Sequence, residues 1–373
     1  MPTTSLTVDN ELLSATSIEA AKEARDVRHV TTPFLAELAR VHGEGQPSKQ
    51  SGHKWVGSFQ TGGHSSPTRR RTGYEQMNLS FSGVLTPMVL TPAEVSYPIG
   101  ISGVEEDLNG GDLQTIELAA RRSKSVMNEA KRQFEQQMIQ GGVSQYDDWL
   151  TLNGIDHAST HKGLLEAAAT PTATIGGFNR ATFAALEGVP NQFFDIGGSF
   201  TSAALPGATN QFFDVGSAFN TSGLTGLYRT IIKAKARATD DLSGLSVICS
   251  EKGMENYKRT IQANERYMVT GTDGQLDATG MNLMINGVPA HVSTFMPNAG
   301  TNSTSNPATF YILDLNAIYV CWSKVIRDGY FSVSDFEPIG NGYQVRVSEI
   351  LVRGQLWVEA FSSSAVLVDG ETF

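Results

Sequence analysis

Two histidines with the spacing of a helical metal pair are the first residues in the chain that could do chemistry. His157 and His161 lie four positions apart, and Asp156 precedes the first of them. On a helix this spacing would place both imidazoles on one face, where they could bind zinc. The Gly, Asn, Ser and Thr residues around them favour a loop, and no third ligand is evident. The sequence therefore argues against a metal site here.

Carboxylates and thiols make an equally weak case for catalysis. Asp273 and Asp277 lie in a turn, but the ligand spacing and final glutamate of an EF-hand loop are missing. An enzyme that hydrolyses sugars would need to gather these residues and Asp314 in one cleft, which nothing in their spacing favours. Cys249 and Cys321 each lie in an apolar, strand-like run, so we expect two buried free thiols and no disulfide.

The common cofactor and catalytic motifs are missing from the sequence. We find no GxGxxG after a strand, no GxxxxGK[ST], no GxSxG, no HExxH and no CxxC. We therefore expect no enzyme, no cofactor and no bound metal. A carbohydrate-active or other hydrolytic enzyme stays as an alternative, because a pair of catalytic carboxylates leaves little trace in a single sequence.

The composition is that of a folded protein. The 373 residues are 40% hydrophobic and 18% charged, and no apolar run approaches the roughly 18 residues of a membrane span. The first residues lack the pattern of a signal peptide, so we expect no membrane contact and residence in a cytoplasm. The formal charge of −10 argues against a free-standing nucleic-acid binder, which is normally basic. It does not exclude a protein that encloses DNA, because an inner wall that does not grip DNA is better kept neutral or acidic.

One long helix over residues 112–140 is the element around which the chain is organised. Asp112 can accept the amides of its first turn, and Gly141 and Gly142 supply a left-handed stop. About 28 residues at 1.5 Å per residue make a rod of roughly 40 Å, which indicates a central strut. Its apolar residues recur at steps of three and four, which predicts one buried face: Leu113, Ile116, Ala120, Met127, Ala130, Phe134 and Met138.

The segments before this helix contain few residues for a core of their own. Residues 1–45 carry a weak apolar stripe and a short amphipathic piece after Pro33, which predicts either a frayed terminal helix or an arm docked on a neighbouring chain. Residues 43–97 are rich in Gly, Ser, Pro and Thr with extended pieces between, which predicts a long two-stranded ribbon. Such a ribbon is marginally stable alone, so we expect it to lie on another subunit.

Charged and aromatic residues in this part of the chain are candidates for contacts between subunits. Three consecutive arginines near the tip of the ribbon are either a solvated basic tip or partners for an acidic surface on a neighbour. Three consecutive acidic residues just before the long helix are the most concentrated acidic partner in the sequence. The candidates are Arg69, Arg70, Arg71, Glu105, Glu106 and Asp107, with Trp55 and Phe59 on the ribbon.

An internal repeat lies between residues 189 and 222. Residues 191–200 recur 19 positions later as residues 210–219, and two copies are too few for a solenoid. The repeat is either a tandem duplication tolerated in a surface loop or a surface used for decoration or subunit contact. Its surface candidates are Phe193, Phe194, Phe212 and Phe213.

Helices and strands alternate after the repeat. The pattern predicts a helix over residues 224–238, a buried strand over 245–249 and a helix capped by Ser250. Strands follow over residues 309–313, 317–322, 330–333, 343–351, 355–361 and 365–368.

This order of elements resembles the major capsid proteins of tailed bacteriophages, the HK97-fold family. Residues 245–250, 257–260 and 265–267 are similar to the strand, helix and Gly-Arg-Tyr passage of that family, with Glu265 where glycine is common. Residues 287–289 resemble its Gly-x-Pro-Val turn, and residues 346–368 resemble its returning strands. The resemblance covers nearly the whole chain except residues 180–222, and it rests on the order of elements more than on any motif.

The resemblance implies the α+β, HK97-like capsid fold and a division of the chain. Its parts would be an N-arm at 1–45, an extended E-loop at 46–98, a P domain at 99–178 with the spine helix at 112–140, an A domain at 179–342 with the repeat-containing insertion at 189–222, and returning P-domain strands at 343–373.

The resemblance also implies a function. The chain would form the hexamers and pentamers of an icosahedral virion head that encloses double-stranded DNA, assembled in the host cytoplasm with portal and scaffolding proteins and with a decoration protein as an optional partner. Some members of the family join subunits through an E-loop lysine and an asparagine of the returning strands. Lys49 and Lys54 are the candidate lysines, but residues 343–362 contain no asparagine, so we expect no crosslink. An encapsulin-type compartment and a phage tail or adhesion protein are the structural alternatives.

Overall fold

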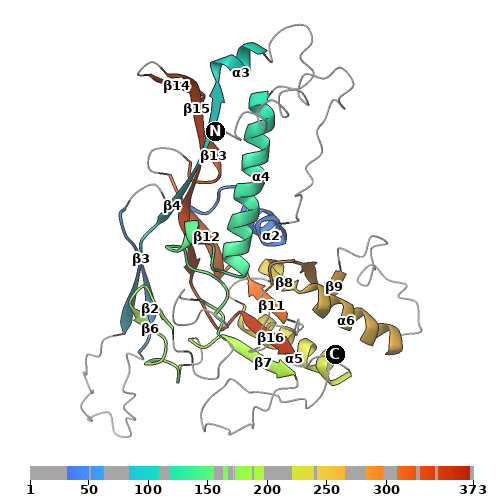
Figure 1. The fold of residues 1–373 in the computed structure, drawn as a ribbon. Helices are drawn as coiled ribbons and strands as arrows, with labels where there is room; N and C mark the ends of the chain where they lie inside the picture. The colour runs from blue at the N-terminus through green and yellow to red at the C-terminus, as the bar shows by residue number, and fades with distance from the viewer. Residues whose placement is uncertain are drawn as a thin grey trace, which may run out of the picture.

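The protein is built on two sheets. The computed structural model describes residues 32–49, 52–62, 84–108, 118–154, 163–166, 171, 173–186, 189–196, 221–238, 242–264, 283–296, 309–324, 328–340 and 343–369. Within these residues two six-stranded sheets form, one in an elongated body and one in a compact body beside its end (Figure 1). Two small hairpins, β2 with β3 and β5 with β6, lie next to the elongated body.

The elongated body is organised by a pair of long antiparallel strands. β4 (Ala93–Ser102) pairs with β15 (Tyr343–Val358) from Val345 opposite Ser102 to Gly354 opposite Ala93. β15 is one strand where the sequence predicted two. Gly354 continues the ladder because a Cβ there would lie 2.6 Å from the Cys321 carbonyl oxygen, so only glycine fits this approach. The remaining strands are β1 (Ser48–Lys49), β12 (Ile318–Ser323), β13 (Ser332–Val333) and β14 (Glu337–Gly340).

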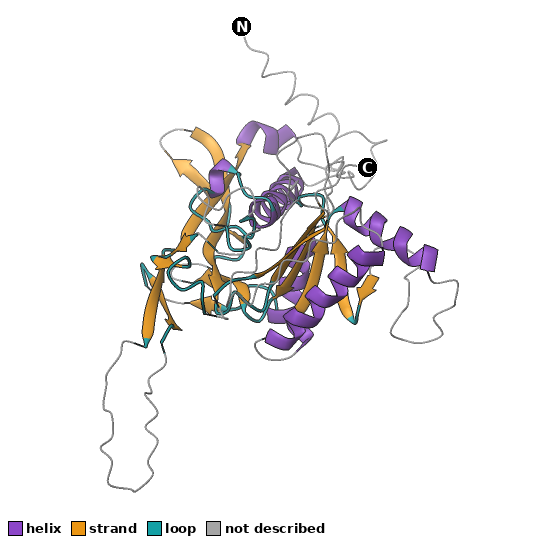
Figure 2. Cartoon of the chain, turned by 90° about the horizontal axis from the view of Figure 1, so that it is seen from below, coloured by secondary structure: helices purple, strands orange, loops and turns teal. Residues whose placement is uncertain are grey.

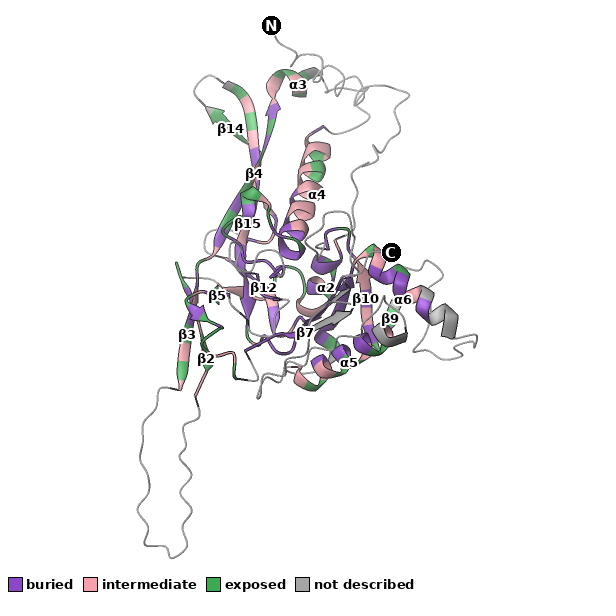
Figure 3. Cartoon of the chain, turned by 60° about the horizontal axis from the view of Figure 1, so that its bottom comes forward, coloured by how far each residue is buried: buried purple, intermediate pink, exposed green. Residues whose placement is uncertain are grey.

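Helix α4 (Leu118–Ile139) is the predicted strut, and it lies along one face of this sheet (Figure 2). Ala130, Phe134 and Met138 are fully buried, which confirms the predicted face. The Phe134 ring lies 5.3 Å from Trp149 and 5.5 Å from Trp322, measured between centroids. Ala120 is exposed, contrary to the prediction, because burial is concentrated in the C-terminal half of α4 (Figure 3). The predicted start of the helix at residues 112–117 lies outside the described residues.

The compact body is the second sheet, in the order β7-β16-β11-β8-β10-β9. Side chains alternate between its faces, so Val247 and Cys249 contact helices α5 and α6, whereas Ile248 joins the main core with Tyr311. Ser250 begins α6 as predicted, since its hydroxyl accepts the amide of Gly253 at 3.0 Å. The elements are β7 (Gln192–Ile196), α5 (Thr221–Arg237), β8 (Leu245–Cys249), α6 (Glu251–Asn264), β9 (Leu283–Ile285), β10 (Val288–Val292), β11 (Thr309–Asp314) and β16 (Ala365–Asp369).

The sheets divide the chain differently from the expected domains. Strands β12, β13 and β14, which fall between 318 and 340 and were expected with residues 179–342, pair into the long sheet. β16 was expected with the returning strands, but it pairs with β11 and β7 in the second sheet. The exchange arises because two turns, at 315–317 and at 359–364, each connect a strand of one sheet to a strand of the other.

The first copy of the repeat is part of the second sheet. β7 covers residues 192–196 and pairs in parallel with β16, from Gln192 opposite Ala365 to Ile196 opposite Asp369. The surface loop, one of the two alternatives left open for the repeat, is therefore wrong for this copy. Its apolar and β-branched residues form a strand at the edge of the sheet instead. Residues 210–219, with Phe212 and Phe213, lie outside the described residues.

Short elements complete the described chain. Helix α2 (Pro33–His42) contacts both α4 and β8. The ribbon consists of β2 (Trp55–Gln60) and β3 (Leu85–Leu90), and it lies beside the hairpin of β5 (Thr174–Ile175) and β6 (Phe178–Asn179). The others are α3 (Gly103–Leu108), η1 (Ser144–Tyr146) and η2 (Leu242–Gly244).

Candidate functional site

The residues considered for catalysis form no site within the described chain. Asp314 is buried, and its carboxylate accepts the amide of Asn316 at 3.2 Å. Asp273, Asp277, His157 and His161 lie outside the described residues. Across the part of the chain that the structure describes, no three His, Cys, Asp or Glu residues lie close enough to hold a metal ion. Both cysteines are buried and free, as expected, and burial raises the pKa of Cys249 to about 12.

No described helix is both long and apolar enough to cross a membrane. The candidate functional sites are the surfaces that could make contacts with other chains. They are the ribbon, the far end of the long strands and the helices that support them.

The inner face of the ribbon packs on its own chain. The Phe59 ring lies 4.8 Å from Phe178 and 5.6 Å from Phe361. Met88 is fully buried, and the amide of Val89 donates to the Gly176 carbonyl at 2.8 Å. This face fixes the position of the ribbon on the body.

The outer face of the ribbon is apolar and exposed. The side chain of Val56 is 61% exposed and that of Leu85 is 66% exposed. Both lie on the side opposite to Phe59 and Met88, since successive side chains of a strand alternate. These exposed apolar side chains make the outer face of the ribbon a candidate contact surface. Arg69, Arg70 and Arg71, expected near the ribbon tip, lie outside the described residues.

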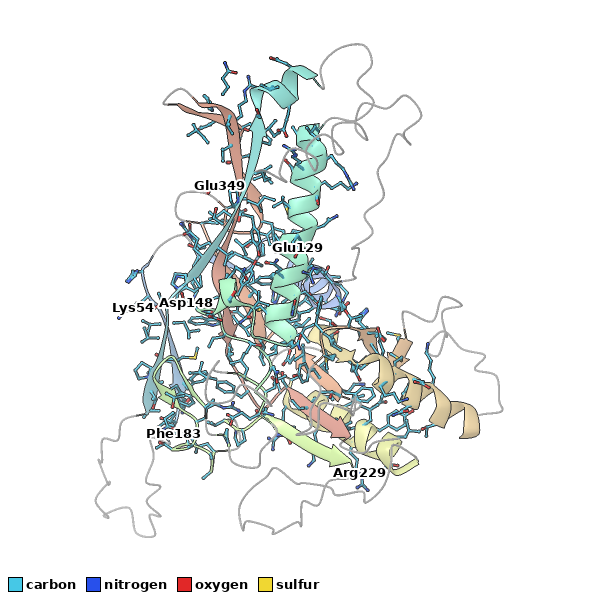
Figure 4. All side chains as sticks on the ribbon, in the orientation of Figure 1. Lys54, Glu129, Asp148, Phe183, Arg229 and Glu349 are labelled. Carbon is cyan, nitrogen blue, oxygen red and sulfur yellow. The ribbon has the colours of Figure 1, made fainter. Side chains whose placement is uncertain are left out.

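Trp55 was expected at a contact between subunits, and the structure corrects this. The residue is only 3% exposed, because the base of the ribbon packs against the long sheet. The Lys49 ammonium lies 5.4 Å from the Trp55 ring centroid and 3.5 Å from that of Trp357, so Lys49 is held on its own chain. Lys54 is exposed at the ribbon base and points away from the body (Figure 4).

The acidic residues before the long helix are used partly within the chain. Arg122 donates to both carboxylate oxygens of Glu105, at 2.9 and 3.0 Å, and this lowers the pKa of Glu105. Glu105 is therefore unavailable to a neighbour, which corrects that expectation. Glu106 pairs with Arg346 at 3.0 Å on an exposed surface, and Asp107 has no ion pair among the described residues.

Exposed apolar side chains also mark the far end of the long strands. α3 and β14 lie together at this end, remote from the compact body (Figure 1). Val104 on α3 is 57% exposed and Ile339 on β14 is 54% exposed. With Glu106 and Asp107, they make this end a second candidate contact surface.

Helix α2 is bound firmly to its own chain. Phe34, Leu35 and Leu38 are buried in the main core, so the expectation that residues 1–45 have little to fold onto is wrong for α2. The Glu135 carboxylate accepts the amides of Phe34 at 2.7 Å and Leu35 at 3.0 Å, which satisfies the first turn of α2. Burial raises the pKa of Glu135 to about 8, although both amide hydrogen bonds oppose this. Residues 1–31 lie outside the described chain.

Polar contacts extend from α2 to the compact body. Glu37 lies 2.9 Å from His291 Nε2 and 2.8 Å from Arg40. Burial alone would raise the pKa of Glu37, but hydrogen bonds from His291 and Arg40 outweigh it and lower the pKa to about 2. His42 Nε2 lies 2.7 Å from the Leu315 carbonyl oxygen. Helix α2 therefore ties α4 to the second sheet.

A buried arginine contacts Phe361, one of the residues against which the ribbon packs. Arg180 is fully buried and donates to Glu166 at 3.0 Å, to the Leu164 carbonyl at 2.8 Å and to Asn191 at 3.0 Å. Its guanidinium lies 4.4 Å from the centroid of Phe361, the ring that Phe59 also approaches. Sequence reasoning missed this network. Its signal was that residues 143–223 contain only two basic residues, Lys162 and Arg180.

Comparison with known proteins gives a result only at the level of structure. No family model and no curated protein matches the sequence. A chain of the cyanophage A-1(L) capsid is similar, with a TM-score of 0.58 and 14% identity, over 94% of this chain and 96% of that chain. The protein has the HK97-like capsid fold.

Other structures with this fold agree. The capsid of a native GTA particle matches with a TM-score of 0.55 and 11% identity, over 95% of both chains. The SrpI encapsulin of Synechococcus elongatus PCC 7942 matches with a TM-score of 0.53 and 11% identity, over 94% of this chain and 91% of that one. The α+β class and the HK97-like fold expected from the order of elements are confirmed. The identities show the fold alone, so what an HK97-like chain of this kind does is a separate question.

Proposed function

We propose that this chain is the major capsid protein of a tailed double-stranded DNA bacteriophage, forming the hexamers and pentamers of an icosahedral head. The observation that carries the proposal is the match to phage capsid chains over nearly the full length of both partners.

Two surfaces support assembly from identical subunits. The outer face of the ribbon exposes Val56 and Leu85, and the far end of the long strands exposes Val104 and Ile339. These are different patches, so a contact between one patch and another region of a second copy is heterologous and generates rings or lattices. The ribbon also has the form of a segment that is stable only when both faces are covered.

The finer partners belong to the same proposal. A head of this kind holds its genome without sequence preference, joins a portal and is assembled on a scaffolding protein in the host cytoplasm. A decoration protein is an optional addition. The proposal assigns no catalytic role, and we infer that the chain acts as a structural subunit.

Electron microscopy of the purified protein tests the proposal. We expect closed shells, or separate hexamers and pentamers, that form without added enzyme or cofactor. Discrete monomers at high protein concentration, with neither shells nor rings, would count against it.

An encapsulin-type compartment is the second candidate, because the SrpI encapsulin matches over almost the same extent. The two functions differ in what the shell encloses. Particles purified from the native source would contain nuclease-protected DNA if the chain is a phage capsid protein. They would contain a protein cargo and no protected DNA if it is an encapsulin.

A further inference from the structure

Helix α4 is basic in an acidic protein. The chain has a formal charge of −10, yet α4 carries five basic residues and two carboxylates. One of these carboxylates, Glu135, is buried beneath α2 with its pKa raised to about 8, so at neutral pH it does not offset the cations of α4. The five cations are Arg121, Arg122, Lys124, Lys131 and Arg132.

Three of these cations follow one side of the helix. Arg121, Lys124 and Lys131 lie at steps of three and seven, with Asn128 between, and this spacing places them on one stripe. Ten residues at 1.5 Å per residue make the stripe about 15 Å long. Lys124 is exposed and the other two are half-buried. We call Arg121, Lys124 and Lys131 the α4 stripe.

Within the described residues, no carboxylate forms an ion pair with the α4 stripe. Arg122 is bound to Glu105, and Arg132 is bound to Glu129 at 2.6 Å, so the other two cations of α4 have acidic partners. No ion pair to the α4 stripe occurs among the described residues. The Lys131 ammonium lies 5.9 Å from the Phe331 ring centroid, and the ring carries no net charge that could neutralise the cation.

Lys124, in the middle of the stripe, is exposed, whereas Lys131 at its end lies beside Phe331, the residue before β13 of the long sheet. α4 lies along one face of that sheet, and α2 contacts only its C-terminal end, around Glu135 (Figures 1 and 2). The N-terminal half of the helix is mostly intermediate or exposed (Figure 3). Of the described elements, none packs over Lys124.

We propose that the α4 stripe faces the enclosed genome and binds the phosphates of double-stranded DNA without sequence preference. The inference rests on the proposed function, and it assigns the α4 side of the subunit to the inside of the shell. It also differs from the expectation of a neutral or acidic inner wall, because the overall charge of −10 conceals a local basic surface.

The geometry fits contact with the DNA backbone. A duplex carries one charge per ~1.7 Å of its axis, so the roughly 15 Å of the stripe faces about nine phosphate charges. Three cations per subunit give weak contacts, and a shell repeats them many times.

Binding of duplex DNA to the purified, unassembled full-length chain tests the proposal. The probe is a fluorescent duplex of about 30 base pairs of random sequence, titrated by anisotropy from about 20 to 200 mM NaCl. We compare the wild-type chain with R121Q/K124Q/K131Q. The matched control is R229Q/K233Q/K252Q, which removes the same charge from one exposed and two half-buried positions on α5 and α6.

We expect the stripe variant to bind about tenfold or more weakly at low salt, with the slope of log K against log salt reduced by roughly two to three. The control should bind within about twofold of the wild type. Equal binding by the stripe variant, equal loss in the control, or no binding by the wild type would each overturn the proposal. Melting temperatures of all three chains show whether they are folded.

Electron microscopy of the same three chains separates this proposal from the proposed function. We expect all three to form shells. If the wild type forms none, the capsid function fails, whatever the binding result. If only the stripe variant fails to form shells, the stripe is a contact between copies and the assignment to DNA is wrong.

Discussion

Helix α2 and the β2–β3 ribbon both precede the long strand β4, and they differ in how much of their surface their own chain covers. α2 buries Phe34, Leu35 and Leu38, and its first amides are accepted by Glu135. The ribbon buries Met88 on one face and exposes Val56 and Leu85 on the other. α2 therefore belongs to the folded subunit, whereas the outer face of the ribbon is exposed and is a candidate contact surface.

This difference reduces the number of segments that are candidates for contacts between subunits. From the sequence, the whole stretch before residue 100 was expected to reach away from its own body. α2, β1 and β4 contradict this, because each is paired or packed within the chain. The need for a neighbouring copy now rests on one face of the ribbon and on the far end of the long strands.

Shortening the ribbon gives the largest expected effect. Replacing residues 63–83 by Asn-Gly should abolish closed shells and shift the melting temperature by no more than about 2 °C. The ends can be joined because the amide of Thr61 donates to the Val84 carbonyl at 2.8 Å. Electron microscopy and thermal unfolding measure the two effects. Normal particles from this variant would show that residues 63–83 are not needed for assembly.

Placing a charge beneath α4 should damage folding itself. Ala130→Asp buries a carboxylate where the native residue is fully buried, and we expect a loss of about 4 kcal/mol in the free energy of unfolding. Ser125→Asp is the control on the exposed side of the same helix and should cost less than about 0.5 kcal/mol. Denaturant unfolding measures both. Equal stabilities would show that the buried face is assigned incorrectly.

Removing the buried arginine should lower the free energy of unfolding. Arg180→Met leaves Glu166 buried without its partner, and we expect a loss of about 3 kcal/mol. Arg346→Met breaks the exposed pair with Glu106 and should cost no more than about 1 kcal/mol. Changing Glu166 to Gln in the Arg180→Met chain should recover part of the loss. If Arg180→Met leaves the free energy of unfolding unchanged, the network contributes no stability.

The carboxylates around α2 should give opposite dependences on pH. The pKa of Glu37 is lowered from 4.5 to about 2, so its stabilisation is present above pH 4.5 and is lost as the pH falls toward 2. The pKa of Glu135 is raised from 4.5 to about 8, so the folded state loses stability as the pH rises from 4.5 through 8.

Unfolding at several pH values checks this pair. The stability advantage of the wild type over Glu37→Gln should shrink by about 2 kcal/mol between pH 5 and pH 2. The free energy of unfolding of the wild type, relative to that of Glu135→Gln, should fall by a few kcal/mol between pH 5 and pH 8. Parallel curves for the wild type and either variant would contradict the corresponding assignment.

Substitutions on the outer face of the ribbon give the smallest expected change in stability. Val56→Ser with Leu85→Ser should change the free energy of unfolding by less than about 0.5 kcal/mol, because both side chains are exposed. The same double variant should raise the protein concentration needed for shells. Phe59→Ser on the inner face should instead cost about 2 kcal/mol, since it removes the contact with Phe178. A double variant that is strongly destabilised would show that the outer face is already covered.

Local patterns in the sequence determined the elements that repeat with a regular period. The buried positions Ala130, Phe134 and Met138 follow from the helical period, and the strand at 245–249 follows from its continuous apolar run. The cap at Ser250 and the two buried free thiols were also predicted, because each depends on residues close in the chain.

Only the tertiary structure decided which distant segments meet. Glu135 caps a helix 100 residues earlier in the chain, and Arg180 donates hydrogen bonds to two separate segments, 163–166 and 189–196, so neither role follows from neighbouring residues. The same cause explains why β12 pairs in the long sheet and β16 in the second sheet. Which strands pair depends on distant partners, and a strand's own residues do not specify them. The sequence specified periods and caps through short-range physics, whereas the choice of sheet, the buried charges and the free face of the ribbon arose from long-range packing.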